Sequence, residues 1–259
     1  MKKTILFSTV LISLLLSCKK KDSNTSDDNN SQPSPSNPVN ANTLSDIDGN
    51  IYKTITIGTQ TWMAENLKVT KYNDGTAITN VSDGGSWSNL TTGAYSWYNN
   101  DISNKATYGA LYNWHAVNTQ KLCPKGWHVP SDEDWTKLET YLANNGYNYD
   151  GSNSTTNVRA KIAKALAEKS GWTADASAGA VGNSDYATYR NKSGFAGLPG
   201  GFRADNGTFN YVGEYSIWWS ASEENPNCAW YRDITYNNPM VDRAYGFKKN
   251  GFYVRCIKD

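Results

Sequence analysis

The sequence predicts an α+β fold, with small antiparallel sheets at both ends of one domain and two helices between them. Three observations support this class. Alternating residues after Asn50 predict a strand, apolar residues at helical spacing after Ser131 and Val158 predict helices, and aromatic-rich segments after Gly194 predict strands again. Segments rich in Gly and Asn separate these elements, which predicts long loops between them.

The chain begins with a secretion signal. Lys2 and Lys3 precede a mostly apolar run from Thr4 to Leu16, which ends one residue before Cys18. A membrane-spanning helix needs about 20 apolar residues, so this shorter run is interpreted as a segment removed on export. The signal resembles that of bacterial lipoproteins, which implies a signal peptide of residues 1–17 and a lipid on the sulfur of Cys18. The alternative is an ordinary signal peptide with a chance cysteine.

Residues 18–44 hold Cys18 and a segment dominated by Ser, Asn, Asp and Pro, without an aromatic residue. Such a segment cannot bury enough apolar surface to offset the entropy lost on ordering. We therefore predict a disordered tether between the lipid and a folded domain of residues 45–259. The tether and lipid predict a protein anchored in the bacterial cell envelope, in the outer membrane and exposed at the cell surface.

The first element of the domain is a strand. Ile51, Ile55 and Ile57 alternate with Tyr52, Thr54 and Thr56, which is typical of a half-buried strand, and Gly58 follows. Residues 70–122 contain only short aromatic pieces between Gly and Asn, and we expect loops there.

Two helices follow. Ser131 is a good N-cap with Asp134 three residues later, and Trp135, Leu138 and Leu142 lie on one helical face before Asn145-Gly146. A second helix is predicted from Val158 to Lys169, where apolar residues at helical spacing precede Gly171.

Strands return in the last third of the chain. Asn206-Gly207 is a strong hairpin signal between aromatic residues. In the last predicted strand Phe252, Val254 and Cys256 share one face by the period of two. We expect that face to point into the core.

Charge and cysteine content restrict the function classes. The 25 Lys and Arg nearly balance the 24 Asp and Glu, so nothing electrostatic favours a nucleic-acid partner. Outside the inner membrane thiols tend to oxidise, and Cys123, Cys228 and Cys256 are therefore disulfide candidates. Three cysteines permit one bridge and one leftover.

Five segments resemble a known family. DIDGNIYKTITIGTQTWMAENL, CPKGWHVPSDEDW, SGFAGLPGGFR, WWSAS and VRCIKD occur in the order and spacing of the Fibrobacter succinogenes major paralogous domain. The resemblance covers nearly all of residues 45–259. It implies a relative of the C-type lectin-like fold and of formylglycine-generating enzymes, with two helices, small antiparallel sheets, long loops and chain ends close together. It implies no settled activity, and a fold alone does not supply one.

The resemblance also implies a disulfide between Cys123 and Cys256, because C-type lectin-like domains tie their last strand to the helical region. Such a bridge would close a loop of over 100 residues and contribute about 4 to 5 kcal/mol in the chain-entropy model. Cys228 is then left as a small buried hydrophobe.

Catalytic alternatives lack their signatures. Formylglycine-generating enzymes carry two closely spaced cysteines near the C-terminus that bind copper, whereas Cys228 and Cys256 are 28 residues apart. A thiol nucleophile at Cys123 would have His115 and His128 close in sequence, but such a thiol would need protection from oxidation. A glycan hydrolase pair among the carboxylates, for example Glu65, Glu214, Glu223 and Glu224, stays open from sequence.

No cofactor is expected. Two histidines without an H-E-x-x-H motif speak against a catalytic zinc. Glu224-Asn225-Pro226-Asn227 is similar to the Glu-Pro-Asn element of sugar-binding C-type lectins, which leaves calcium open beside a plain turn. The acid is not adjacent to Pro226, and we favour the turn.

The aromatic residues have two interpretations. Six tryptophans in motifs and strands are expected in the core, namely Trp62, Trp127, Trp135, Trp218, Trp219 and Trp230. Trp87, Trp97 and Tyr98 lie in Gly- and Asn-rich segments and are the candidates for a ligand-binding surface, since their flat faces stack on sugars or peptide side chains.

The sequence therefore predicts a lipid-anchored, cell-surface binding or adhesion module without catalytic activity. Its expected partners are the membrane, through the N-terminal lipid, and a glycan or protein ligand. Two alternatives remain, namely an enzyme related to formylglycine-generating oxidases or a glycan hydrolase, and a structural subunit of a surface assembly.

Overall fold

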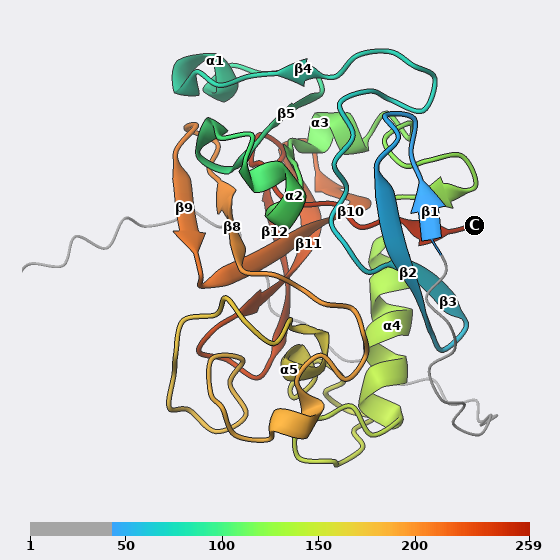
Figure 1. Ribbon diagram of the computed structural model, residues 1–259, viewed down its shortest axis with the longest axis vertical. Helices are drawn as coiled ribbons and strands as arrows, with labels where there is room; N and C mark the ends of the chain where they lie inside the picture. Colours follow the sequence, from blue (N-terminus) through green and yellow to red (C-terminus); the bar gives the residue numbers. More distant parts are fainter. Residues whose placement is uncertain (1–42) are drawn as a thin grey trace, which may run out of the picture.

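The computed structural model describes residues 43–259 (Figure 1). The signal peptide, the lipidation at Cys18 and the tether up to residue 42 lie outside the described residues. The first strand, β1 (Thr43–Ser45), begins before the boundary predicted at Ser45. In the described part of the chain, none of the helices has the length and apolar character needed to cross a membrane.

Three sheets make up the domain. The first has the order β1-β2-β3-β13-β7, with β2 (Ile51–Ile57), β3 (Gln60–Met63), β13 (Ile257–Lys258) and β7 (Trp127–His128). The second has the order β12-β11-β10-β8-β9, with β12 (Val241–Phe247), β11 (Cys228–Thr235), β10 (Tyr215–Asn225), β8 (Gly200–Arg203) and β9 (Phe209–Val212). The third is small, with β4 (Thr79–Asn80), β5 (Ala94–Ser96) and β6 (Leu111–Tyr112).

The helices are short except for one. They are α1 (Gly84–Ser88), α2 (Asn104–Tyr108), α3 (Trp114–Val117), α4 (Asp132–Asn144) and α5 (Ala163–Leu166), with 3-10 turns η1 (Tyr98–Asn100) and η2 (Ala187–Tyr189). The structure is thus α+β, as predicted. Most strand pairs are antiparallel, but β8 pairs with β10 and β4 pairs with β5 in parallel, which the sequence did not indicate.

The predicted helix after Ser131 is confirmed as α4. The Ser131 hydroxyl accepts a hydrogen bond from the backbone N–H of Asp134 at 3.1 Å, and the Asp134 carboxylate accepts one from the backbone N–H of Ser131 at 3.0 Å. This reciprocal capping box satisfies donors that the helix itself cannot pair. In Figure 1 the helix runs along one side of the molecule, beside β2 and β3, and it packs against β10 and β11.

The second predicted helix is wrong for most of its length. Only Ala163–Leu166 form a turn of helix, because the backbone beyond it pairs elsewhere. The N–H of Glu168 donates to the carbonyl of Gly197, and the N–H of Gly197 donates to the carbonyl of Leu166. A tertiary pairing therefore replaces the helical hydrogen bonds that the apolar spacing predicted.

The predicted strand at Ile51 is confirmed, but its buried face changes along the strand, since Ile57 is buried at its end and Thr56 is exposed. Tyr52 and Thr54 are buried, whereas Ile51 is 65% exposed. The Tyr52 hydroxyl donates to the Asp46 carboxylate and accepts from the backbone N–H of Lys68 at 2.9 Å. A tyrosine with both bonds satisfied can be buried at low cost.

The core divides into two clusters on either side of β10. Trp218 and Trp219 are neighbours in this strand, so their side chains point to opposite faces, and both are buried. Trp218 lies in the cluster with Trp62 and Trp135, and Trp219 lies in the cluster with Phe252. These four tryptophans confirm the core prediction.

Trp127 and Trp230, also predicted in the core, are only half-buried. The Arg243 guanidinium lies over the Trp230 ring at 3.6 Å from the ring centroid. This contact is typical of a ring at the surface of a sheet, where a cation can cover one face.

The C-terminal segment runs through the interior rather than along one face of a strand. All residues from Gly251 to Ile257 are buried, and β13 begins only at Ile257. The backbone of Phe252 pairs with Tyr112, and that of Tyr253 with Trp218. The predicted burial of Phe252, Val254 and Cys256 is confirmed, and the residues between them are buried as well.

A buried ion network fastens α4 to the second sheet. Arg232 of β11 donates to the carboxylates of Glu139 and Asp132 of α4, and the Glu139 and Arg232 side chains are 1% and 0% exposed. Arg243 of β12 donates to the Asp132 carboxylate at 2.9 Å. Burial raises the pKa of Glu139, against the opposing charge of Arg232. Burial also acts to raise the pKa of Asp132, but bonds from Arg243 and Arg232 outweigh it and lower that pKa overall.

We expect Arg232→Met to lower the free energy of unfolding by about 3–5 kcal/mol, because it leaves Glu139 buried without its main partner. The measurement is urea denaturation followed by tryptophan fluorescence. Lys137→Met is the matched control, since Lys137 pairs with Glu133 at the exposed surface of the same helix, and it should leave the midpoint unchanged. Equal midpoints for both variants would contradict the structural role of the network.

Candidate binding site

The aromatic residues predicted to bind a ligand are buried. Trp87 is 0%, Trp97 3% and Tyr98 6% exposed, so the prediction that they form a surface is wrong. The Trp87 indole N–H donates to the carbonyl of Lys249 at 2.8 Å, and the Arg203 guanidinium covers its ring at 4.2 Å. The Gly- and Asn-rich segment is folded inward around its rings, which therefore contribute to packing.

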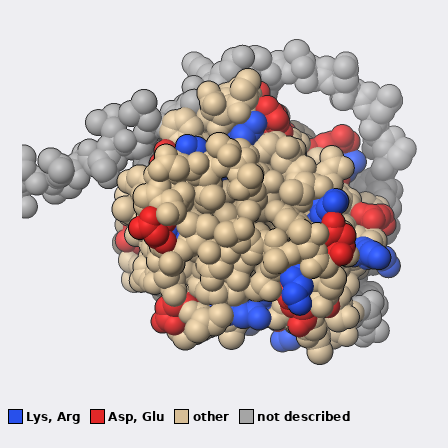
Figure 2. Space-filling view, turned by 90° about the horizontal axis from the view of Figure 1, so that it is seen from above, with Lys and Arg blue, Asp and Glu red and all other residues tan. Residues whose placement is uncertain are grey.

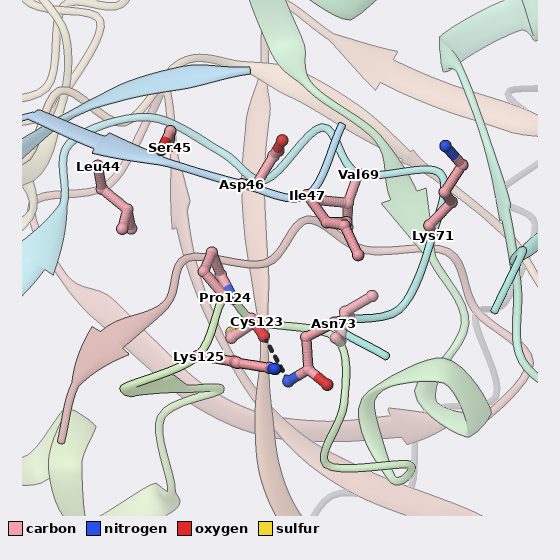
Figure 3. A pocket seen from close by; sticks show the side chains of 11 residues that line it. Leu44, Ser45, Asp46, Ile47, Val69, Lys71, Asn73, Cys123, Pro124 and Lys125 are labelled. Atoms are coloured by element: carbon pink, nitrogen blue, oxygen red, sulfur yellow. Dashed lines mark hydrogen bonds between the residues drawn. The ribbon is translucent and has the colours of Figure 1, made fainter. Parts of the chain in front are cut away.

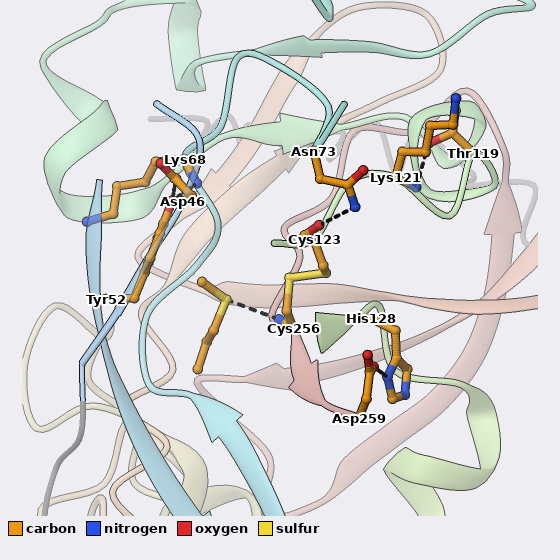
Figure 4. The surroundings of a disulfide bond; sticks show 11 residues. Asp46, Tyr52, Lys68, Asn73, Thr119, Lys121, Cys123, His128, Cys256 and Asp259 are labelled. Atoms are coloured by element: carbon orange, nitrogen blue, oxygen red, sulfur yellow. Dashed lines mark hydrogen bonds and ion pairs between the residues drawn. A yellow bond between two sulfur atoms is a disulfide. The ribbon is translucent and has the colours of Figure 1, made fainter. Parts of the chain in front are cut away.

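Cys123 and Cys256 form the expected disulfide, with an S–S distance of 2.03 Å and a sequence separation of 133 (Figure 4). Both are buried, and so is Cys228, which is not in a disulfide. The sulfur atoms of Cys123 and Cys256 are thus unavailable as nucleophiles. The bridge joins the segment before α4 to the segment before β13.

His128 fastens the chain end in the same region. Its Nδ1 lies 2.7 Å from the Asp259 carboxylate, and its Nε2 lies 3.4 Å from the Asp134 carboxylate (Figure 4). His128 thus links the C-terminal residue to the first turn of α4. The alternative in which this histidine activates the Cys123 thiol is excluded, since Cys123 is bonded to Cys256.

The segment considered for calcium is a hairpin turn. Asn225 ends β10 and Cys228 begins β11, and the Asn225 side-chain oxygen accepts from the backbone N–H groups of Asn227 and Cys228 at 2.9 and 3.0 Å. Residues 43–259 contain no group of three or more His, Cys, Asp or Glu side chains arranged to hold a metal ion.

One hollow of about 340 Å³ lies beside the disulfide (Figure 3). Leu44, Ile47, Val69 and Leu122 give it an apolar lining, and Ile47 is 46% exposed. The Asn73 amide donates to the Cys123 carbonyl at 2.9 Å. Polar side chains complete its lining, namely those of Ser45, Asp46, Lys71, Asn73 and Lys125. Only two of the family-like segments contribute to the hollow, DIDGNIYKTITIGTQTWMAENL and CPKGWHVPSDEDW, so it is the weaker candidate for a specific site.

A second cavity of about 430 Å³ is polar and combines three of the family-like segments. We call it the motif cavity. Its lining consists of Lys53, Ala64, Glu65, Asn66, Lys68, Ala106, Thr107, Gly109, Glu168, Asn191, Gly194, Ala196, Leu198 and Arg255. The first segment supplies Lys53 and Ala64–Asn66, SGFAGLPGGFR supplies Gly194, Ala196 and Leu198, and VRCIKD supplies Arg255.

Asn66 and Arg255 form the centre of its wall. The Asn66 side-chain oxygen accepts from Arg255 Nε and from the Trp218 indole N–H, each at 2.9 Å. The Asn66 amide donates to the carbonyl of Tyr108 at 2.8 Å. One amide thus connects the C-terminal segment, β10 and α2, so the wall is fixed by buried bonds.

The loop that contains Asn191 and Ala196 also belongs to the wall of the motif cavity, and its backbone is strained. Asn191 and Ala196 adopt φ values of 53° and 55°, in the left-handed region that non-glycine residues rarely occupy. The loop is held there by Arg255, which donates to the carbonyls of Phe195 and Ala196, and by the Asn191 side chain, which accepts from the N–H of Ala196. Such strain persists only where surrounding bonds enforce it, and it is common at binding sites.

The charges of the cavity are only partly paired. Lys68 Nζ lies 3.4 Å from the Glu65 carboxylate, and the Glu168 carboxylate accepts from the Asn191 amide at 3.2 Å. Arg255 is 1% exposed, and burial lowers its pKa to about 9, an effect that the charges of Glu65 and Glu168 oppose. The guanidinium is therefore still charged at neutral pH.

A family model described as the Fibrobacter succinogenes major domain matches residues 55–258. The chain belongs to this family. The match confirms the resemblance seen in the sequence motifs. The Fibrobacter succinogenes major domain of this chain supplies every residue of the motif cavity except Lys53. No curated protein and no solved structure matches the chain.

Sequence reasoning named Glu65 as one of several carboxylates but missed the other polar residues of the motif cavity. One signal was present in GFYVRCI, where Arg255 stands alone among apolar residues. A charge in such a context is buried with partners or faces a site. The partners come from residues 66, 195 and 196, which no local pattern connects to position 255.

The arrangement is suited to binding a small polar group. Its volume lies in the range of ligand pockets, and carboxylate, amide, ammonium and guanidinium groups converge on it. The disulfide and the bonds of Asn66 hold the walls in place, so little order has to be gained when a ligand enters.

Mass spectrometry of the protein digested without reductant should find a peptide joining Cys123 to Cys256. The same peptide should remain in a Cys228→Ala variant, which is the control. We further expect replacement of both bridged cysteines by serine to lower the free energy of unfolding by about 5 kcal/mol, since a long loop is released in the unfolded chain. Free thiols at both positions in the native protein would contradict the structure.

Proposed function

We propose that the protein is a lipid-anchored, cell-surface binding or adhesion module without catalytic activity, and that its ligand, a glycan or a protein, enters the motif cavity. The observation that carries this proposal is the convergence of three family-like segments on one polar cavity with a fixed wall. The hollow beside the disulfide combines only two of these segments, and the rings of Trp87, Trp97 and Tyr98 are buried.

A glycan is the ligand class that the lining favours. Six lining residues are small or apolar and none is aromatic, whereas the polar ones present carboxylate, amide, hydroxyl and cationic groups. Hydroxyl groups of a sugar can both donate to carboxylates and accept from lysine and arginine. A peptide side chain would find few large apolar surfaces to contact.

A C-type lectin-like fold is part of the proposal. Two observations support it. The disulfide connects the last strand region to the segment that precedes the one long helix. Strands from both ends of the domain, β1–β3 and β13, share the first sheet, which brings the ends together (Figure 1).

A second candidate function is hydrolysis of a glycan. It is favoured by the presence of Glu65 and Glu168 in the same cavity, because glycoside hydrolases use a pair of carboxylates across the scissile bond. The pairing of Glu65 with Lys68 and of Glu168 with Asn191 is equally suited to binding. Release of reducing sugar ends from a bound glycan would favour the enzyme over the binding module.

A structural subunit of a surface assembly is the third candidate. Figure 2 shows a broad face without charged side chains over α1 and β4. Residues 84–100 contain no Lys, Arg, Asp or Glu. A neighbouring chain packed on this face would favour this alternative.

The anchor is tested separately. We expect the protein to incorporate a labelled fatty acid in bacteria and to fractionate with the outer membrane. Cys18→Ala should abolish the label and release the protein from the membrane fraction, because the sulfur of this residue would carry the lipid. Labelling that persists in the Cys18→Ala variant would contradict the assignment of the lipid to this residue.

A glycan array tests the ligand class. We expect binding of one group of glycans, equal with and without added calcium, and loss of binding in Thr107→Trp. Thr107 is exposed and lines the motif cavity, so the indole would fill the cavity without disturbing the core. Thr91→Trp, on an exposed loop outside the cavity, is the matched control. Binding unaffected by Thr107→Trp would show that the ligand contacts another surface.

A further inference from the structure

The motif cavity carries an excess of positive charge. Three cationic side chains, Lys53, Lys68 and Arg255, line it together with two carboxylates, Glu65 and Glu168. Lys68 and Glu65 form an ion pair, and their charges largely cancel. Glu168 is then left to oppose both Lys53 and Arg255, so the cavity has one net positive charge.

Arg255 is the unusual member of this set. Its side chain is buried, yet its hydrogen bonds run to the side-chain oxygen of Asn66 and the carbonyls of Phe195 and Ala196, all of them neutral acceptors. Within residues 43–259, none of the ion pairs of 4.0 Å or less includes Arg255. A buried charge is costly unless it is paired.

Three bonds use three of the five N–H groups of the guanidinium. Both terminal nitrogens therefore retain one N–H beyond those that donate to Phe195 and Ala196. Because Arg255 forms part of the cavity wall, an anion inside the cavity would meet a guanidinium already fixed in orientation. Such a group binds a planar carboxylate better than a flexible lysine does.

We propose that the motif cavity recognises an acidic sugar, with the carboxylate of a uronic-acid-type residue directed to Arg255 and Lys53 and its hydroxyl groups directed to Glu168 and Asn191. This inference rests on the proposed function, because it names the ligand class of the same site. An acidic sugar matches both the cationic and the hydrogen-bond-accepting groups of the lining, since each sugar residue combines one carboxylate with several hydroxyl donors.

An acidic peptide carries the same anionic group but fits the remaining wall less well. Ala64, Ala106, Gly109, Gly194 and Ala196 leave room for a broad ring and provide no pocket for an apolar side chain. Glu168 can accept a hydrogen bond from a sugar hydroxyl, a donor that the side chains of an acidic peptide lack. A glycan is therefore the occupant that the chemistry favours.

The experiment compares three matched glycans by calorimetry with the purified full-length protein, namely an oligomer of galacturonic acid, its methyl ester and the corresponding neutral galactose oligomer. We expect the acid to bind about 10- to 100-fold more tightly than the ester or the neutral oligomer, because only the acid pairs the positive charge of Arg255 with a negative one. The preference should shrink as salt is raised.

Amino-acid substitutions test which residues produce the preference for the acidic glycan. Lys53→Ala should weaken binding of the acid by about two- to fivefold and weaken binding of the neutral oligomer less, so that the preference for the acid shrinks. Lys125→Ala is the control, since Lys125 is exposed but lines the hollow beside the disulfide instead. Arg255→Gln should remove the preference for the acid; if this variant does not fold, the ligand series and the Lys53 variant still decide.

The outcomes separate this inference from the proposed function. Equal affinity for acid, ester and neutral oligomer would overturn the inference and leave a glycan-binding module. Binding of a glutamate-rich peptide in preference to every glycan would overturn the acidic-sugar assignment. A glycan found by the array to bind at a surface other than the motif cavity would overturn the inference together with the proposed site.

Discussion

The fold depends on one constraint, which is that residues 251–257, close to the end of the chain, are buried among all three sheets. From Gly251 to Ile257 the backbone bonds to all three sheets, through Tyr112 of β6, Ile217 and Trp219 of β10 and Met63 of β3. The disulfide at Cys256 fixes this segment covalently to the region before α4. A terminal segment would ordinarily fray. Here its loss would remove pairing partners from every sheet at once.

The position of Arg255 follows from this constraint. The neighbours of this residue, Val254 and Cys256, are completely buried, so its side chain starts inside the fold and finds its hydrogen-bond partners there. Asn66 and two loop carbonyls provide them, and the loop adopts a left-handed backbone at Ala196 to present its oxygen. Burial of the C-terminal segment thereby produces both a charged wall and a strained loop around the same cavity.

In the proposed function, the polar groups of the motif cavity therefore recognise the ligand, and aromatic rings on loops do not. Trp87, Trp97 and Tyr98 serve the packing of the segment that contains them, and the disulfide and the network of Arg232 hold the framework on which the cavity walls stand. A cavity whose walls are fixed before a ligand arrives loses little entropy on binding.

The sequence by itself determined the features that local forces decide. The capping box before α4, the strand at Ile51–Ile57 and the hairpin at Asn206-Gly207 each depend on residues a few positions apart, and the family followed from motifs read directly. Only the tertiary structure decided the short length of α5, the burial of the loop aromatics and the motif cavity. In each of these cases the deciding contact joins distant segments, as Leu166 with Gly197, Trp87 with Lys249 and Asn66 with Arg255. The spacing of apolar residues does not predict which distant segments come into contact, since many residues of suitable size could occupy either side of such a contact.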